Sequence, residues 1–188
     1  MHDGNLTAID HTHLFIGDTH FGHTGIIDMA MRPFSDIRAH DRALIEQWNA
    51  MVKPTDTVWH LGDFAGDEVP FQDAASIFGK LNGIKRLIVG NHDGEEICTK
   101  LAWASVDEMR TLVAPGCKIV LCHYPMRDWN GQYGGDVHFY GHSHDRLPSS
   151  RLSWDCGVDH QSFIPMKFKA IKVAMDSLPV WDFTGAPA

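Results

Sequence analysis

Five short segments of this chain carry polar side chains that commonly bind metal ions. In chain order they are Asp18-Thr19-His20, Gly62-Asp63, Gly90-Asn91-His92-Asp93, His123 and Gly141-His142-Ser143-His144. The candidate ligands are two carboxylates, one carboxamide and four imidazoles: Asp18, His20, Asp63, Asn91, His123, His142 and His144. Mixed ligation of this kind suits borderline divalent ions such as manganese, iron, cobalt, nickel or zinc. Because there are enough ligands for two ions, the pattern indicates a two-metal hydrolase.

Most of these polar segments directly follow a short apolar run that is typical of a buried strand. The runs are residues 14–17, 58–61, 87–89, 119–122 and 137–140. Open α/β folds place their ligand sites at the rim formed by the carboxyl ends of the strands. We therefore expect an α/β fold with a dinuclear metal site at the C-terminal rim of the strands.

A histidine in a strand is more often a core residue than a metal ligand, and we interpret His60 and His138 in this way. The same interpretation fails for His142 and His144, which flank a single residue of a tight turn. Burying two such imidazoles without partners would be costly. Together with His123, they are better explained as ligands.

The apolar pattern predicts the elements that position these residues. Leu44, Trp48 and Met51 recur at helical spacing, with Ser35 or Asp36 as the candidate N-cap and Pro54 after the end. Weaker patterns predict helices over 73–81 and 95–102. Predicted strands cover residues 13–17, 56–61, 85–89, 118–122, 137–140, 152–156 and 168–173, with a strand or hairpin over 106–113. Residues 124–135 are expected to form a loop near the metal rim.

Length and cysteine content are those of one ordinary domain in a reducing compartment. The 188 residues are enough to bury a core, and we expect one domain over 1–188. No apolar run approaches the roughly 20 residues needed to span a bilayer. The four cysteines form no CxxC pair, and Met1–Asn5 lacks the basic start of a secretory signal. A cytoplasmic protein without a membrane partner is expected.

The formal net charge of −8 argues against binding to long duplex nucleic acid through its phosphates. Two bound divalent cations would create a small positively charged region on an otherwise acidic protein. This favours a small or medium-sized phosphate ester as the substrate.

In this order, the motifs Asp-x-His, Gly-Asp, Gly-Asn-His-Asp, a lone His and Gly-His-x-His resemble the calcineurin-like metallophosphoesterase superfamily. The resemblance runs from Asp18 to His144 and on to Asp159. Segments 17–23, 32–34, 48–49, 60–64 and 155–159 look like those of its small bacterial and phage-type members. The resemblance implies a four-layer αββα sandwich with two mixed sheets.

The resemblance also implies how the ligands divide between two ions. One ion would be bound by Asp18, His20 and His144, and the other by Asn91, His123 and His142. Asp63 would bridge the two. The implied cofactors are two divalent transition-metal ions, manganese first, with iron, zinc, cobalt or nickel as alternatives.

In the implied reaction, a hydroxide at the ion pair attacks phosphorus, so that no serine or cysteine nucleophile is needed. His92 follows the ligand Asn91 directly and would donate a proton to the leaving alkoxide or a hydrogen bond to the phosphoryl oxygen. Asp63 is counted as catalytic together with His92, because it would bridge the two ions. Asp93 either orients His92 or caps a turn.

Several further residues have two interpretations. The resemblance at residues 32–34 favours contact of Arg32 with substrate phosphate over a surface position before a turn proline. His23 could contact substrate or support a ligand. Asp155 and Asp159 are expected to be structural hydrogen-bonding partners. Loop packing is favoured over a leaving-group pocket for Tyr124, Arg127 and Trp129.

The predicted function is hydrolysis of phosphate esters. Phosphodiesters are favoured over monoesters, because the short chain leaves little room for a cap over the site. The alternatives are a nuclease acting on short single-stranded ends and a noncatalytic interaction scaffold on the same fold. A scaffold would be expected to have lost ligands or His92, and all are present. A structural metal site fits poorly, since such sites are usually closed tetrahedra of cysteine and histidine.

Overall fold

The computed structural model describes residues 6–180, whose strands form two five-stranded sheets. Met1–Asn5, where no secretory signal is expected, lies outside the described residues. The first sheet has the strand order β10-β2-β3-β4-β5. Its strands are β10 (Met166–Lys167), β2 (His13–Ile16), β3 (Thr57–His60), β4 (Ile84–Ile88) and β5 (Val106–Asp107). All neighbours are parallel except β10, which runs antiparallel to β2.

The second sheet has the order β1-β6-β7-β8-β9. Its strands are β1 (Thr7–Ala8), β6 (Met109–Ala114), β7 (Cys117–Cys122), β8 (Val137–Tyr140) and β9 (Ser153–Asp155). Only β6 and β7 pair antiparallel, so this sheet is mixed as well. The predicted α/β sandwich with two mixed sheets is therefore confirmed.

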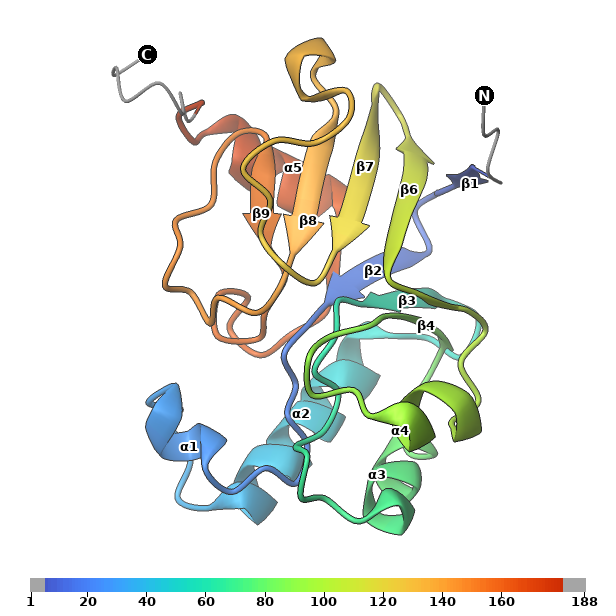
Figure 1. Cartoon of the computed structure of the whole chain (residues 1–188), viewed down its shortest axis with the longest axis vertical. Coiled ribbons are helices and arrows are strands. Elements are labelled where there is room, and N and C mark those ends of the chain that lie inside the picture. The colour runs from blue at the N-terminus through green and yellow to red at the C-terminus, as the bar shows by residue number, and fades with distance from the viewer. Residues whose placement is uncertain (1–5, 181–188) are drawn as a thin grey trace.

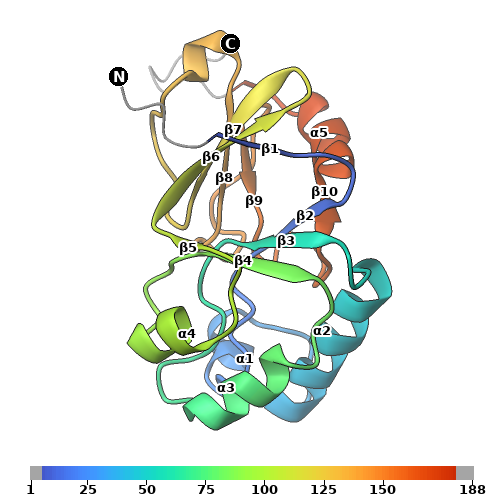
Figure 2. The ribbon, with the colours of Figure 1, turned by 90° about the vertical axis from the view of Figure 1, so that its right-hand side faces the viewer.

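Four helices gather on the side of the first sheet that faces away from the second (Figures 1 and 2). They are α1 (Ile26–Met29), α2 (Ile37–Met51), α3 (Phe71–Phe78) and α4 (Glu95–Lys100). The longest, α2, begins where the Asp36 side chain accepts a hydrogen bond from the Ala39 N–H at 2.8 Å, as expected of an N-cap. Leu44 and Trp48 of α2 pack against β2 and β3 in one core cluster. None of the helices described between residues 6 and 180 has both the length and the apolar character needed to cross a bilayer.

The second core cluster lies between the two sheets. Phe15 and Trp59 contribute to it from the first sheet, and Leu121 and Phe139 from the second. The rings of Phe15 and Phe139 meet edge-to-face, with centroids 5.0 Å apart. Strand alternation sends His138, between Val137 and Phe139, to the opposite face, where it is buried beneath Trp129 of the loop before β8. That loop includes the 3-10 helix η1 (Gln132–Gly134).

The strand predicted over residues 168–173 is wrong, because these residues begin helix α5 (Phe168–Asp176). Short apolar runs fit both periods, and the deciding residue lies beyond the predicted segment. Ile171 and Met175, four residues apart, are both buried in the core between the sheets. The short strands β1 and β10 were not predicted, because two residues are too few to show an alternation.

Replacing Phe139 with alanine should destabilise the protein by about 3–5 kcal/mol, because the ring is fully buried and the surrounding sheets cannot close the cavity. Denaturant unfolding in the presence of chelator would measure this loss without a contribution from metal binding. Tyr133→Ala is the matched control, since this residue is 94% exposed and the loss of its ring should change stability little. Equal stability of the two variants would contradict the assignment of the inter-sheet core.

Candidate metal centre

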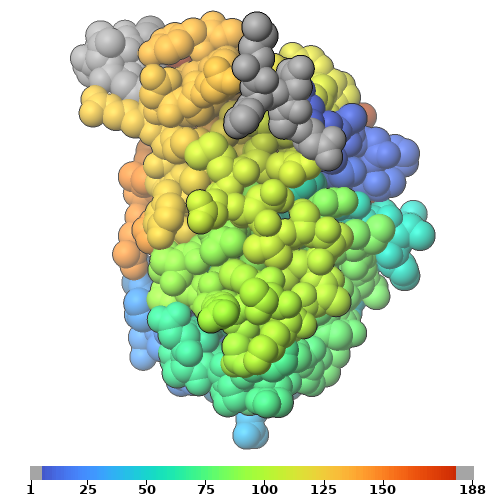
Figure 3. Space-filling view, turned by 45° about the vertical axis from the view of Figure 1, so that its right-hand side comes forward, coloured from blue at the N-terminus to red at the C-terminus, as the bar shows by residue number. Residues whose placement is uncertain are grey.

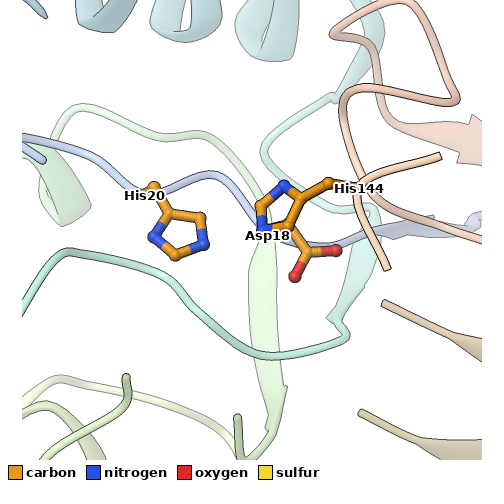
Figure 4. Close-up of side chains that lie close together, drawn as sticks. All are labelled: Asp18, His20 and His144. Atoms are coloured by element: carbon orange, nitrogen blue, oxygen red, sulfur yellow. The ribbon is translucent and has the colours of Figure 1, made fainter. Parts of the chain in front are cut away.

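Two groups of ligand side chains lie next to each other at the carboxyl ends of the strands. Asp18, His20 and His144 form one group (Figure 4), and Asp63, His123 and His142 form the other. Within each group the candidate ligand atoms all lie within 4.8 Å of one another. Asn91 joins the second group, because its Oδ1 is 3.1 Å from His123 Nε2 and 3.0 Å from His142 Nδ1. The structure thus brings together all seven side chains that the sequence predicts as ligands.

Asp63 lies between the two groups. Its Oδ2 is 3.5 Å from Nε2 of His20, in the first group, and 3.4 Å from Nε2 of His123, in the second. A carboxylate oxygen at this position can reach an ion held by either group. The geometry therefore supports the predicted bridging role for Asp63.

Burying the carboxylates of the site in their charged form costs free energy unless cations lie beside them. Asp18 is fully buried, and burial raises its pKa to about 7 even though His144 and His123 act to lower it. Burial would also raise the pKa of Asp63, but the hydrogen bond and charge of His123 hold it below its usual range. His123 itself has a pKa raised to about 9, because its bond to Asp63 and the charge of Asp18 outweigh its burial. The carboxylates attract positive charge, which divalent cations would supply.

His20 tests whether the residues fit a metal ion. Burial lowers its pKa to about 2, so the ring is neutral and keeps a free lone pair. Its Nε2 is buried and has no hydrogen-bond partner. Buried polar atoms in proteins are nearly always paired, so an unpaired imidazole nitrogen beside two carboxylates fits a metal ligand.

Hydrogen bonds fix which nitrogen two of the other imidazoles present. His123 Nδ1 donates to the Leu61 carbonyl oxygen at 2.6 Å, and His144 Nδ1 donates to Asp159 at 2.7 Å. In both rings Nε2 is the nitrogen available to a metal ion, which would displace any proton held there. Metal-binding histidines are usually oriented by such bonds.

The ligand loops require unusual backbone conformations. Five of the seven candidate ligands have φ between 47° and 66°, in the left-handed region: Asp18, His20, Asp63, His142 and His144. Residues other than glycine rarely adopt this backbone conformation, and those that do cluster at functional sites. Gly62, with φ 92°, precedes Asp63, and a Cβ at this position would lie 2.5 Å from His123 Nδ1. A glycine is therefore needed where the two ligand loops meet.

Arg32 neither lies on the surface nor has a donor available for a substrate phosphate. Its side chain is buried, and its guanidinium donates to both oxygens of Asp159 at 2.8 Å and to the carbonyl oxygens of Asp18 and Thr19. The remaining N–H lies 2.8 Å from His40 Nε2. All five donors are thus engaged, and none is left for a substrate phosphate. Arg32 instead holds Asp159, which in turn orients His144.

The contacts of His23 are those of a residue that supports a metal ligand. Its Nδ1 is 3.2 Å from Nδ1 of His20, and its Nε2 is 3.8 Å from the Glu68 carboxylate. A bond between the two Nδ1 atoms leaves His20 Nε2 facing Asp63. The alternative that His23 supports a ligand therefore fits the geometry better than direct contact with substrate.

His92 stands beside the ligands, with its ring centroid 5.1 Å from that of His20. Asp93 does not orient it, because the Asp93 carboxylate accepts the backbone N–H groups of Asp63, Phe64 and Gly90. The turn-capping interpretation of Asp93 is thus correct. The carboxylate next to the His92 ring is that of Asp67, whose Oδ1 lies 3.0 Å from Nδ1. Asp67 was missed, because only the fold shows which acidic side chain approaches this ring.

The remaining candidates are mostly structural. Asp155 accepts hydrogen bonds from the Ser143 hydroxyl and the Gly157 N–H, as expected of a structural partner. Trp129 is buried and donates to the Asp136 carbonyl oxygen, so it packs the loop. Tyr124 is 47% exposed and its ring centroid lies 4.8 Å from that of His142, so this residue borders the site. Arg127 is exposed on the same loop.

Residues 12–154 match the calcineurin-like phosphoesterase superfamily domain, and the chain belongs to this superfamily. An uncharacterised protein of Methanocaldococcus jannaschii is 31% identical over 163 residues, covering 86% of this chain and 80% of that protein. The Gene 66 protein of Mycobacterium phage L5 is 27% identical over 165 residues, covering 73% of this chain and 79% of that protein. Among solved structures, a protein of unknown function from Aquifex aeolicus has a TM-score of 0.68 at 23% identity, covering 89% of this chain and all of that one. This last similarity shows the fold alone.

Asp63→Asn should impair the binding of both ions, because the neutral carboxamide has no negative charge to share between them. Asp18→Asn should affect mainly the ion of its own group. Metal content after dialysis against manganese, measured by mass spectrometry, distinguishes the two variants. Loss of a single ion from Asp63→Asn would contradict the bridging role.

Arg32→Met should destabilise the fold by about 3–5 kcal/mol, because it leaves the Asp159 carboxylate without its buried partner. Denaturant unfolding measures the loss. Arg38→Met, which removes an exposed arginine at the start of α2, is the control and should be nearly neutral. A stable Arg32→Met protein with only a raised KM would restore the substrate-contact interpretation.

Proposed function

We propose that this member of the calcineurin-like phosphoesterase superfamily is a metal-dependent hydrolase of phosphate esters that favours phosphodiesters. The observation that carries the proposal is the pair of ligand groups joined by Asp63, with the His92 ring directly beside them. Purely structural metal sites have closed coordination, whereas Asn91 and His142 here are exposed. An open side gives a phosphate group access to the ligands.

Two divalent ions bound there would lower the pKa of a water molecule to about 7 and neutralise charge on the phosphate. In the hydrolysis, the water oxygen forms a new bond to phosphorus while the bond from phosphorus to the alcohol oxygen breaks. The alcohol oxygen gains one proton, and the net source of that proton is the water. No covalent intermediate with a protein side chain is required.

His92 is the side chain that we assign to deliver this proton. Its Nδ1 faces the Asp67 carboxylate, with 3.0 Å between Nδ1 and Oδ1, and we assign Nε2 as the ring nitrogen that meets the leaving oxygen. The backbone N–H of His92 donates to Asp63 Oδ1 at 2.9 Å, which fixes the backbone of His92 relative to this carboxylate. Arg32 and Asp159 orient His144, and His23 supports His20.

The phosphodiester preference rests on the open side of the site. Asn91, His142 and Tyr124 are all exposed, so a substrate with a substituent on both sides of phosphorus can enter. Hydrolysis of short single-stranded nucleic acid ends is the second candidate, because it uses the same centre. The acidic charge of −8 weakens it. A noncatalytic scaffold would have no need of the complete ligand set.

We further propose manganese as the native metal and a cytoplasmic setting. Carboxylate and carboxamide oxygens combined with imidazoles suit manganese, with iron, zinc, cobalt and nickel as alternatives. The four cysteines, Cys98, Cys117, Cys122 and Cys156, are free thiols, which fits a reducing compartment.

The proposal is tested with metal-stripped protein and two substrates, an aryl phosphomonoester and the matching bis-aryl phosphodiester. Manganese, nickel, cobalt, zinc and magnesium are added back singly. We expect manganese to restore turnover, faster for the diester. Faster monoester hydrolysis would contradict the diester preference, and no turnover of either ester by protein that holds two ions would favour the scaffold.

His92→Ala should lower kcat by about 10²–10⁴-fold while metal content stays near normal, because the ring donates a proton and binds no ion. The loss should be smaller for aryl esters with very acidic phenols, which need little protonation on leaving. Metal content and the turnover of esters with more and less acidic phenols are measured on the same preparation. An equal loss of bound metal would contradict the proton-donor assignment.

A further inference from the structure

A cavity of about 330 Å³ opens beside His92. Its apolar lining comes from Val69, Phe71 and Ile97, and its acidic lining from Asp67, Glu95 and Glu96. These residues belong to the segment that runs into α3 and to the start of α4. Figure 3 shows the two segments as neighbouring green and yellow-green surfaces on one face of the molecule.

The position of the cavity relates it to one part of the substrate. In an in-line displacement, the leaving oxygen departs on the side opposite the attacking water. The group that protonates the leaving oxygen must lie within hydrogen-bond reach of it. Because His92 is both the assigned proton donor and part of the cavity wall, an alcohol that leaves toward His92 would extend into this cavity.

Apart from His92, the titratable side chains that line the cavity are acidic. Three carboxylates line it, and none of the lining residues in the described part of the chain is a lysine or an arginine. Lys100 forms an ion pair with Glu96 and lies 5.6 Å from the Phe71 ring centroid, so it offsets one of the three. Asp67 lies next to the ring of His92, so Glu95 is the lining carboxylate for which no ion pair is seen among the described residues. An anionic leaving group would be repelled here, whereas a cationic group on an apolar body would be attracted.

We propose that this cavity binds the leaving alcohol of the substrate and selects apolar alcohols that carry a positive charge or none over those that carry a negative charge. This rests on the proposed phosphoesterase function. The apolar wall provides a surface for the body of the alcohol, and the carboxylates determine the preferred charge.

The test uses three aryl methyl phosphodiesters that differ only at the meta position of the phenol, which carries a trimethylammonium, a carboxamide or a sulfonate group. The manganese-loaded protein is assayed, and each kcat/KM is divided by the rate constant for hydrolysis of that ester in hydroxide alone. This removes the intrinsic difference between the phenols. We expect the cationic ester to exceed the anionic one by about 3- to 10-fold, the range for partly exposed charges. The ratio should fall as salt screens the charges.

The double variant Glu95→Gln/Glu96→Gln should lower this ratio toward one while it still hydrolyses the carboxamide ester. Glu46→Gln, which removes an exposed charge from α2, is the matched control and should keep the ratio. A ratio near one in the unmodified protein, or a ratio unchanged by the double variant, would overturn the inference. Because the carboxamide ester is hydrolysed in either case, these outcomes leave the proposed function standing; absence of turnover with all three esters would overturn both.

A size test supplies a second readout. Gly94 lines the cavity and a Cβ there meets no atom within 4 Å, so Gly94→Leu adds bulk at the cavity wall. It should lower kcat/KM for a naphthyl ester relative to the phenyl ester. Gly134→Leu, at another glycine with open space, is the control and should keep the naphthyl-to-phenyl ratio. An unchanged ratio in Gly94→Leu would also count against the cavity as the leaving-group site.

Discussion

The position of the Asp63 carboxylate between two sets of ligands is the constraint on which the site depends. One oxygen lies between His20 and His123, while the other accepts the His92 N–H. Asp93 accepts the N–H groups of Asp63 and Phe64 and so ties the two ligand loops together. A small displacement of Asp63 would therefore disturb both ligand groups and His92 at once.

Holding this arrangement carries a free-energy cost that the rest of the fold must offset. Left-handed conformations at residues other than glycine cost on the order of 1–3 kcal/mol each, and five candidate ligands adopt them. The carboxylates of Asp18 and Asp63 are buried as well. Two apolar clusters, one between the sheets and one beneath α2 and α3, supply the opposing stability. Arg32 adds a buried ion pair with Asp159, which extends the support from the ligand His144 into the core.

The sequence predicts the parts of this structure that depend on local pattern. The ligand segments lie where apolar runs end, and Asp36 is recognisable as a helix cap because capping acts over three residues. The structure of α5 could not be assigned in the same way, because Phe168–Val173 fits two periods and Met175 decides between them. The partners of Arg32 and His92 were also beyond local reasoning. Arg32 and Asp159 are 127 residues apart in the chain, and which carboxylate meets which cation is decided by packing.

The most direct test of this account is anomalous X-ray diffraction from crystals of the protein grown with manganese. The account predicts two manganese peaks about 3.5–4 Å apart, the usual separation in two-metal sites. Asp63 should contact both, with Asp18, His20 and His144 around one and Asn91, His123 and His142 around the other. A single peak, or two peaks of which Asp63 contacts only one, would contradict it.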